Sequence, residues 1–181
     1  MAVLFSIGHS NHPLQTFVAL LTAHEIQVLV DVRAFPTSRR WPHFDRQALH
    51  DTLATLDIRY VWNGALGGRR KGRKDSPHTA WTVPAFRHYA DHTETAEFAD
   101  GLRQLLSLAN DARVAFMCAE ARYTQCHRRL IADQLVVAGH TVRHIESRTR
   151  APEHALPDFA RVVAGRIIYD GGTQLALPGS R

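Results

Sequence analysis

The stretch Gln27-Val28-Leu29-Val30-Asp31-Val32 decides the fold class, because it is nearly continuously apolar over the length of one strand. Strands with this pattern are covered by helices on both faces of a parallel sheet. Four further strands are predicted at 3–7, 58–62, 113–118 and 141–145, and segments with apolar residues at helical spacing separate them. The sequence therefore predicts an α/β domain, three-layered and Rossmann-like, with about five mainly parallel strands and helices on both faces.

Local signals place the helices between these strands. Pro13 stands at a first helical position, Asp45 at an N-cap, and Gly139 is the expected C-cap of the last helix. A short helix is predicted near 84–90 and a longer one near 93–109. Each predicted strand is therefore followed by helical sequence before the next strand begins.

The length of the chain favours one domain with an appended tail. A chain of 181 residues with 45% apolar residues can bury one substantial core. We expect residues 1–145 to form a single α/β domain and residues 146–181 to be a C-terminal extension. The extension contains a candidate edge hairpin, with strands at 166–169 and 173–177 turning at Asp170-Gly171-Gly172.

Two features indicate the compartment. The chain has no apolar stretch long enough to cross a membrane, and its first residues lack the pattern of a secretory signal. We therefore expect a soluble, cytoplasmic protein that does not contact a membrane. In a reducing cytosol a disulfide is improbable, so Cys118 and Cys126 are interpreted as thiols, metal ligands or packing residues.

The positive charge of the chain is carried almost entirely by arginine. The formal net charge is +5, and lysine occurs only at 71 and 74. Arginine suits bidentate recognition of phosphate, although genomic base composition alone could also enrich it. The basic residues cluster in two predicted loops, the second within a long polar connection at 63–80. These clusters are Arg33, Arg39 and Arg40 in the first loop and Arg69, Arg70, Lys71, Arg73 and Lys74 in the second. A polyanionic partner, either a nucleotide or a nucleic acid, is expected.

Reactive side chains follow three of the predicted strands at their carboxyl ends, where ligands bind in open parallel sheets. His9 and Ser10 follow the first strand, Asp31 and Arg33 end the second, and Cys118-Ala119-Glu120 ends the fourth. The sequence therefore predicts one shared site.

The segment from Cys118 to Arg128 supports three chemistries. Cys126, near a helix N-terminus and beside His127 and Arg128, could be a nucleophile. Cys118, Cys126 and His127, with or without His9, offer soft ligands for zinc. Arg128 and the amides at the helix start could hold a phosphate while Glu120 acts as acid or base. The structural alternatives also stay open.

Those alternatives assign packing and pairing roles to the same residues. Cys118 ends a buried strand and could simply belong to the core. Glu120 could form an ion pair with Arg128, and Asp31 could pair with Arg33 in the same way.

Several motifs together resemble a known family. They are Ile7-Gly8-His9-Ser10, Asp31-Val32-Arg33 with Ser38-Arg39-Arg40, Leu66-Gly67-Gly68-Arg69, and Met117-Cys118-Ala119-Glu120 followed by Cys126-His127-Arg128. In this order they resemble the domain of unknown function 488 (DUF 488) family over residues 1 to about 145. The resemblance implies a three-layer α/β domain with two functionally important cysteines, and it supplies no substrate. Many relatives carry a proline where this chain has Arg122-Tyr123-Thr124, which affects the expected conformation of that loop.

The sequence thus predicts an enzyme that acts on a phosphate-bearing substrate, a nucleotide or a nucleic-acid base. The catalytic candidates are Glu120, Cys126, His127, Asp31 and Cys118. The candidates for binding substrate or phosphate are His9, Ser10, Arg33, Arg39, Arg69 and Arg128. No cofactor is required, and zinc is an alternative at Cys118, Cys126 and His127. The second reading is a non-catalytic nucleic-acid-binding or regulatory module that depends on zinc or on its thiols.

Overall fold

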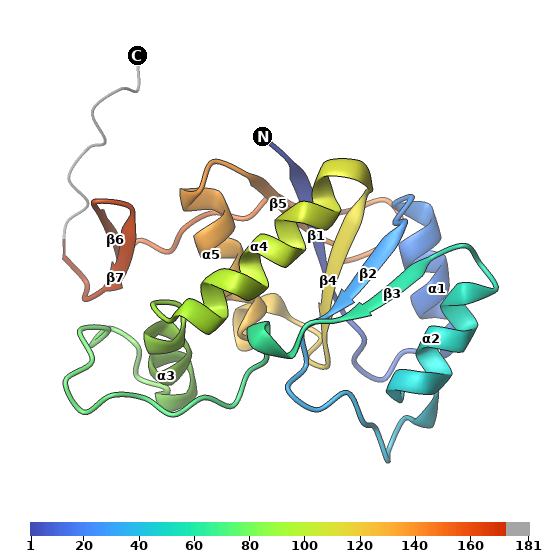
Figure 1. Ribbon diagram of the computed structural model, residues 1–181, viewed down its shortest axis with the longest axis horizontal. Coiled ribbons are helices and arrows are strands. Elements are labelled where there is room, and N and C mark those ends of the chain that lie inside the picture. Colours follow the sequence, from blue (N-terminus) through green and yellow to red (C-terminus); the bar gives the residue numbers. More distant parts are fainter. Residues whose placement is uncertain (173–181) are drawn as a thin grey trace.

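A five-stranded parallel sheet forms the centre of the computed structural model, which describes residues 1–172 (Figure 1). The strands are β1 (Val3–Gly8), β2 (Val28–Asp31), β3 (Arg59–Trp62), β4 (Val114–Cys118) and β5 (Thr141–His144). Their order across the sheet is β3-β2-β4-β1-β5, and every neighbouring pair is parallel. The predicted three-layer α/β fold, with five strands, is confirmed.

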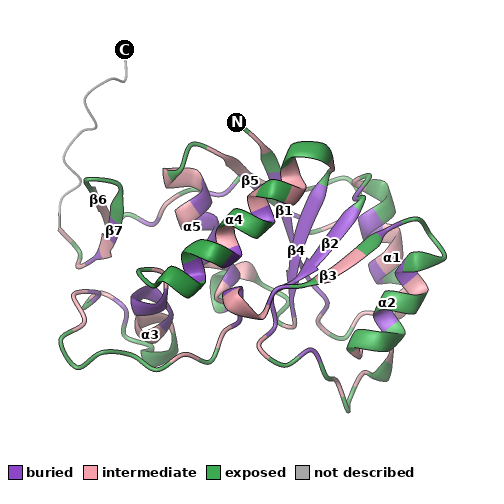
Figure 2. Cartoon of the chain, viewed as in Figure 1, coloured by how far each residue is buried: buried purple, intermediate pink, exposed green. Residues whose placement is uncertain are grey.

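Helices cover both faces of the sheet. The first face carries α1 (Leu14–Ala23) and α2 (Arg46–Ala54), and the second carries α3 (Pro84–His92), α4 (Ala96–Asp111) and α5 (Arg128–Val137). Side chains alternate between the two cores, so Leu29 packs toward α1 and α2 while Val28 and Val30 pack toward the other helices. The central strands β2 and β4 are therefore buried along their whole length, as Figure 2 shows.

Capping side chains define where two of the helices begin. The carboxylate of Asp45 accepts a hydrogen bond from the backbone N–H of Gln47 at 3.3 Å, as predicted for this N-cap. The hydroxyl of Thr95 accepts one from the N–H of Phe98 at 3.2 Å, so the long helix begins after Thr95 rather than near 93. No helix among residues 1–172 is long and apolar enough to cross a membrane.

The C-terminal segment forms a hairpin that contains the strand predicted at 166–169. Strand β7 (Arg166–Tyr169) pairs antiparallel with β6 (Ala160–Val163), in a separate two-stranded sheet. The connecting residues Ala164 and Gly165 both have positive φ, at 49° and 78°, which a two-residue hairpin turn requires. The expected second strand at 173–177 lies outside the described residues.

A continuous chain of buried polar groups joins this hairpin to the sheet. We call it the buried polar chain; from end to end its members are Arg128, Ser6, His144, His154, Asp133 and Tyr169. All six are buried. The segment after residue 145 therefore contributes polar partners as well as apolar side chains to the interior of the molecule.

The acceptor at one end of the buried polar chain determines the direction of its hydrogen bonds. Asp133 can only accept, so Tyr169 donates to it at 2.7 Å and the Nε2–H of His154 donates at 2.7 Å. The remaining nitrogen of His154 then accepts from His144 at 2.9 Å, and His144 accepts from the hydroxyl of Ser6 at 2.7 Å. The hydroxyl of Ser6 accepts from Arg128 at 3.2 Å. Burial lowers the pKa of His144 to about 2, so this imidazole is neutral between the cation Arg128 at one end of the chain and the carboxylate of Asp133 at the other.

Candidate functional site

The predicted site lies where the chain changes direction across the sheet. From β1 the chain crosses β4 to reach β2, whereas from β4 it crosses β1 in the opposite direction to reach β5. The carboxyl ends of β1 and β4 are thus a topological switch point, the usual place for a ligand crevice in open α/β sheets. Gly8 and Cys118 are paired across these two strands at their last positions.

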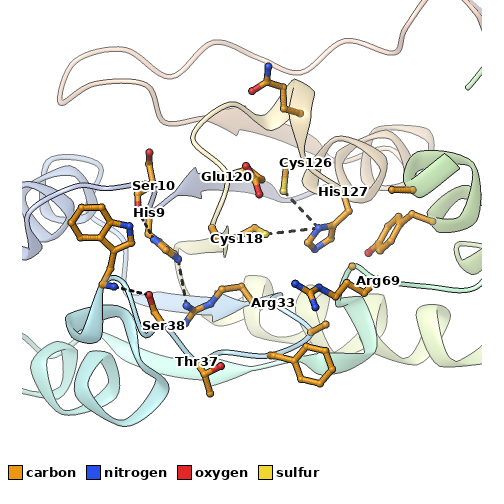
Figure 3. A pocket seen from close by; sticks show the side chains of 18 of the residues that line it. His9, Ser10, Arg33, Thr37, Ser38, Arg69, Cys118, Glu120, Cys126 and His127 are labelled. Atoms are coloured by element: carbon orange, nitrogen blue, oxygen red, sulfur yellow. Dashed lines mark hydrogen bonds between the residues drawn. The ribbon is translucent and has the colours of Figure 1, made fainter. Parts of the chain in front are cut away.

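A pocket of about 820 Å³ opens at this point, which is within the range that small-molecule sites occupy (Figure 3). The residues from the sequence prediction that line it are His9, Ser10, Arg33, Arg69, Cys118, Glu120, Cys126 and His127. Three others, Asp31, Arg39 and Arg128, are not part of its wall. The structure therefore brings together side chains from the segment after β1, from the loop after β2, from the 63–80 connection, from the end of β4 and from the β4–α5 loop.

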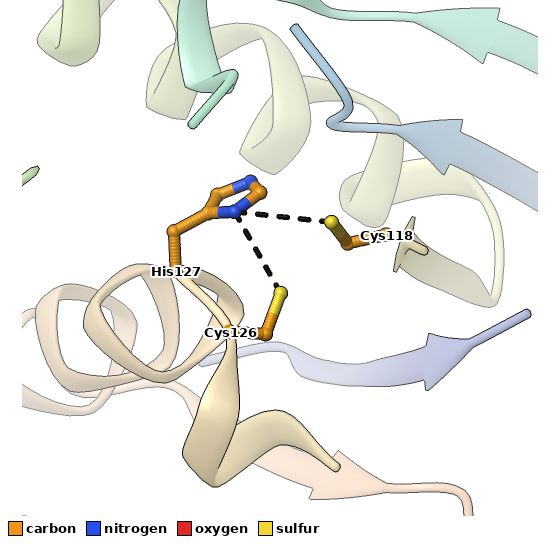
Figure 4. A group of neighbouring side chains, drawn as sticks. All are labelled: Cys118, Cys126 and His127. Carbon is orange, nitrogen blue, oxygen red and sulfur yellow. Dashed lines mark hydrogen bonds between the residues drawn. The ribbon is translucent and has the colours of Figure 1, made fainter. Parts of the chain in front are cut away.

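The two thiols and His127 form a compact group on the pocket wall, the thiol–imidazole group (Figure 4). The Nδ1 atom of His127 lies 3.8 Å from Sγ of Cys118 and 3.6 Å from Sγ of Cys126. The other ring nitrogen, Nε2, donates a hydrogen bond to the carbonyl oxygen of Val32 at 2.9 Å. Because Nε2 carries a proton, Nδ1 is the basic nitrogen that can take a proton from a thiol or bind a metal ion.

The charges around the two thiols separate their pKa values. Burial opposes ionisation of Cys126, but its hydrogen bond with Cys118 and the charges of His127 and Arg128 bring its pKa well below the ordinary value. The hydrogen bond with Cys126, together with burial, raises the pKa of Cys118 well above it. Cys126 is therefore the more acidic thiol of the pair.

Neighbouring residues leave little freedom to the imidazole. The ring of Tyr89 on α3 packs against His127 with ring centroids 4.9 Å apart, and the Tyr89 hydroxyl donates to the carbonyl of Leu66 at 2.7 Å. A Cβ atom at Gly68 would lie 3.0 Å from Nδ1 of His127. Glycine at this position therefore keeps open the space directly beside the basic nitrogen.

Asp31 and Arg33 form a buried ion pair, which is one of the alternatives that the sequence left open. Arg33 donates to both carboxylate oxygens of Asp31, at distances between 2.6 and 3.0 Å, and the Tyr60 hydroxyl donates to Asp31 at 2.6 Å. Asp31 has no exposed surface, and Arg33 also donates to the carbonyl of Phe44 at 2.8 Å. These hydrogen bonds hold the pair in place beside the pocket, which Arg33 lines.

His9 belongs to the same support. Its Nδ1–H donates to the carbonyl of Ser10 at 2.9 Å, its Nε2 faces Arg33 at 3.4 Å, and its ring stacks on Phe44 with centroids 4.2 Å apart. Burial, and then the charge of Arg33, lower its pKa to about 4. His9 is thus neutral, and among the described residues it is not grouped with the two cysteines and His127 as a metal ligand.

Arg128 fixes the β4–α5 loop through hydrogen bonds to its backbone. It donates to the backbone carbonyls of Glu120 at 2.6 Å and Ala121 at 3.3 Å, and it forms no ion pair with the Glu120 carboxylate, which was one of the alternatives that the sequence left open. Arg128 is only 1% exposed, which removes it from contact with a pocket ligand. A Cβ atom at Gly8 would lie 1.9 Å from the Glu120 carbonyl, so glycine is required where the loop crosses the end of β1. The Glu120 side chain itself is exposed and lines the pocket.

Arg69 and Arg40 are the pocket arginines that stay available to a ligand. Arg69 lies over the ring of Phe35 at 5.8 Å and Arg40 over the ring of Trp41 at 5.5 Å, and neither has an acidic partner within residues 1–172. Arg70, by contrast, donates hydrogen bonds to the carboxylate of Glu97 and to three backbone carbonyls. Sequence reasoning listed Arg40 in a basic cluster but not among the site residues.

Backbone strain marks two positions of the pocket. Ser10 and Arg69 both have positive φ, at 48° and 60°, although neither is glycine. Such conformations cost free energy and occur often at functional sites. Sequence reasoning missed Phe35 at the mouth and Tyr89 behind His127, which line the pocket together with Trp41. Only Phe35 had a signal, its place directly after the second strand, since Tyr89 lies within an ordinary amphipathic helix.

Acidification is expected to destabilise the protein through its buried neutral histidines. Burial lowers the pKa of His144 to about 2 and that of His9 to about 4, below the ordinary value of 6.5, and it also lowers the pKa values of His78 and His92. Below pH 6.5 these histidines bind protons in the unfolded chain but not in the folded chain. Their contribution to the free energy of unfolding is therefore complete above pH 6.5 and is lost as the pH falls. For His9 and His144 together the loss is about 2 kcal/mol between about pH 6 and about pH 5.

Urea unfolding at several pH values measures this loss. The variant His144→Gln, which cannot titrate there, is expected to show a smaller slope of unfolding free energy against pH. An unfolding free energy that stays constant over the same range would contradict the neutral assignment of these histidines.

Comparison with known proteins gives one match, to a family. The family model described as "Domain of unknown function DUF488" matches residues 13–135. No curated protein and no solved structure matches the chain. The match covers α1 to most of α5, including the thiol–imidazole group, and confirms the resemblance drawn from the motifs. The chain therefore belongs to the family Domain of unknown function DUF488.

Proposed function

We propose that this protein is an enzyme that acts on a nucleotide, with its phosphate at Arg69 and Arg40 and its chemistry at the thiol–imidazole group. One observation carries the proposal: a basic imidazole nitrogen faces two sulfurs in a pocket that also holds an exposed carboxylate and an arginine with no acidic partner among the described residues. Groups for binding an anion and groups for moving protons thus face one cavity.

Arg69 is the principal candidate for the phosphate. Figure 3 draws its guanidinium pointing into the pocket toward His127, above an aromatic ring. A guanidinium that lies over an aromatic face keeps its N–H edges available for the oxygens of an anion. The positive φ of Arg69 costs free energy, and such strain is often found at residues whose side chain must point in one direction for function.

The aromatic rim favours a nucleotide over a simple phosphate ester. Phe35 is 66% exposed at the mouth of the pocket, and Trp41 lines the same pocket. Exposed aromatic rings next to cations are typical of sites where bases stack, with a contribution of about 1–3 kcal/mol per base. The pocket volume of about 820 Å³ also accommodates a nucleoside with its phosphate.

The carboxylate of Glu120 supplies the second proton-transfer group. It lines the same pocket as His127, and Arg128 positions its backbone rather than neutralising its charge. A carboxylate and a thiolate–imidazole pair, facing one ligand from different sides, suit a reaction that needs an acid and a base or a nucleophile.

Removal of Arg69 tests the binding half of the proposal. Arg69→Ala is expected to weaken binding of nucleoside monophosphates about 10–100-fold, which corresponds to the loss of one charge-assisted contact. Isothermal titration calorimetry measures the dissociation constant, with adenosine, inorganic phosphate and a short single-stranded oligonucleotide as comparison ligands.

Lys71→Ala is the matched control, because it removes a charge from the same loop at a residue that does not line the pocket. This variant should change affinity less than about threefold at physiological salt. If both variants lost affinity for the monophosphate equally, the loss would come from the net charge of the loop, which would contradict a phosphate site at Arg69. Tighter binding of the oligonucleotide than of the monophosphate would assign the substrate to nucleic acid.

A further inference from the structure

We propose that Cys118, Cys126 and His127 bind one zinc ion, whose fourth coordination position opens into the pocket. The inference rests on the proposed function only for the statement that a ligand reaches this position; with the ion bound, the three side chains act as its ligands and Glu120 remains the proton-transfer group. The binding of the ion itself follows from the geometry of the three side chains.

The distances within the group match tetrahedral zinc. Bonds of about 2.3 Å to sulfur and about 2.0–2.1 Å to nitrogen place a sulfur and a nitrogen ligand about 3.6 Å apart around a tetrahedral ion. The observed separations from Nδ1 of His127 are 3.6 Å to Cys126 and 3.8 Å to Cys118. All three ligand atoms lie within 4.8 Å of one another, which admits the sulfur-to-sulfur distance of about 3.8 Å that the same geometry requires.

The imidazole is oriented as a zinc ligand would be. Histidines that bind metal usually donate their other N–H to a carbonyl or a carboxylate, which holds the ring in place and leaves the ligating nitrogen unprotonated. In His127 this role belongs to Nε2, which donates to the carbonyl of Val32 at 2.9 Å. The space beside Nδ1 is kept free by Gly68, where a Cβ atom would lie 3.0 Å from that nitrogen.

The number of ligands indicates a site that leaves one position open. Structural zinc sites use four protein ligands, whereas catalytic sites use three and leave the fourth for water or substrate. Within residues 1–172 the group has three members, and His9 is turned away toward Ser10 and Arg33. Both sulfurs and the imidazole line the pocket, so the open position faces the cavity.

The surrounding charge also favours ionised sulfur. Arg128 is buried beneath the group, and no carboxylate pairs with it in the described part of the chain. A buried cation without a carboxylate is stabilised by nearby thiolates. Thiolate is the form in which cysteine binds zinc.

Metal analysis of the full chain tests the inference without any knowledge of the substrate. Protein purified without chelator from zinc-supplemented cells is expected to contain about one zinc per chain by mass spectrometry. Protein stripped with a chelator and titrated with Co²⁺ should develop the visible bands of tetrahedral cobalt and a thiolate-to-cobalt charge-transfer band.

Variants identify the ligands. Cys118→Ser, Cys126→Ser and His127→Gln should each weaken cobalt binding at least about 100-fold. His50→Gln, which changes an exposed histidine on α2, should leave it unchanged. Circular dichroism identifies any variant that fails to fold, and the cobalt spectrum of the unmodified chain remains as a test that depends on no variant.

Two outcomes would overturn the inference: less than about 0.1 zinc per chain with no cobalt–thiolate band, or purification under reducing conditions as a Cys118–Cys126 disulfide. Neither outcome decides the proposed function, because nucleotide binding at Arg69 is measured separately. Conversely, a stoichiometric metal in a protein that binds no nucleotide would uphold the zinc site and remove the proposed function.

Discussion

Asp133→Ala is expected to lower the free energy of unfolding by about 3–5 kcal/mol. The carboxylate of Asp133 accepts from His154 and from Tyr169 at 2.7 Å each, in a region with no exposed surface. Its removal leaves two buried donors without a partner, and each costs about 1–3 kcal/mol. It also removes the negative end of the buried polar chain, whose other end is Arg128.

Chemical denaturation followed by circular dichroism measures this effect. Asp100→Ala, the same substitution on the exposed surface of α4, should change the unfolding free energy by less than about 0.5 kcal/mol. Tyr169→Phe removes one donor and leaves the carboxylate, so a loss of about 1 kcal/mol is expected. If Asp133→Ala were no more destabilising than Asp100→Ala, the two histidines would not depend on the carboxylate, and the direction assigned to the chain would be wrong.

Glu120→Gln is expected to reduce kcat about 10²–10⁴-fold while nucleotide affinity changes by less than about threefold. The substitution keeps the size of the side chain and removes its ability to exchange a proton. Binding should persist because the phosphate is assigned to Arg69 and Arg40, which come from other loops. The effect would therefore appear in turnover and not in the dissociation constant.

The measurement starts from a screen of nucleotides and oligonucleotides for any product, followed by steady-state kinetics on the best substrate. Glu153→Gln, at an exposed position outside the pocket, serves as the control and should retain full turnover. Unchanged turnover in Glu120→Gln would remove the acid–base role from this residue. A protein that binds nucleotides at Arg69 but produces no turnover would instead be the binding module that the sequence left as its second reading.

Much of the architecture could be predicted from local patterns. The apolar run at 27–32 and the alternation of strand and helix signals were sufficient for a parallel α/β fold, because both rest on side-chain periodicity within a few residues. The position of the pocket could be expected from the same pattern, since the carboxyl ends of parallel strands share one edge. The family motifs pointed to the same segment, Cys118 to Arg128.

The hairpin shows where local patterns were insufficient. Strand 166–169 was predicted, whereas the strand at 160–163 that pairs with it was not, because the turn between them depends on the positive φ angles that Ala164 and Gly165 adopt. The buried polar chain had no local signal at all. Ser6 and His144 are separated by 138 positions and meet only because β1 and β5 are neighbours in the sheet.

By itself, the sequence determined the layers of the fold, the edge of the sheet that carries the site, and the residue types that reach it, since each depends on spacing along the chain. The tertiary structure alone decided which of these side chains are available. Arg33 donates hydrogen bonds to Asp31, and Arg128 donates to backbone carbonyls. Arg69 faces the pocket. The tertiary structure also decided that the two sulfurs and one imidazole nitrogen meet at zinc-binding distances. The reason is physical: the partners of a buried polar group are set by which elements pack together, and that packing is a property of the whole chain.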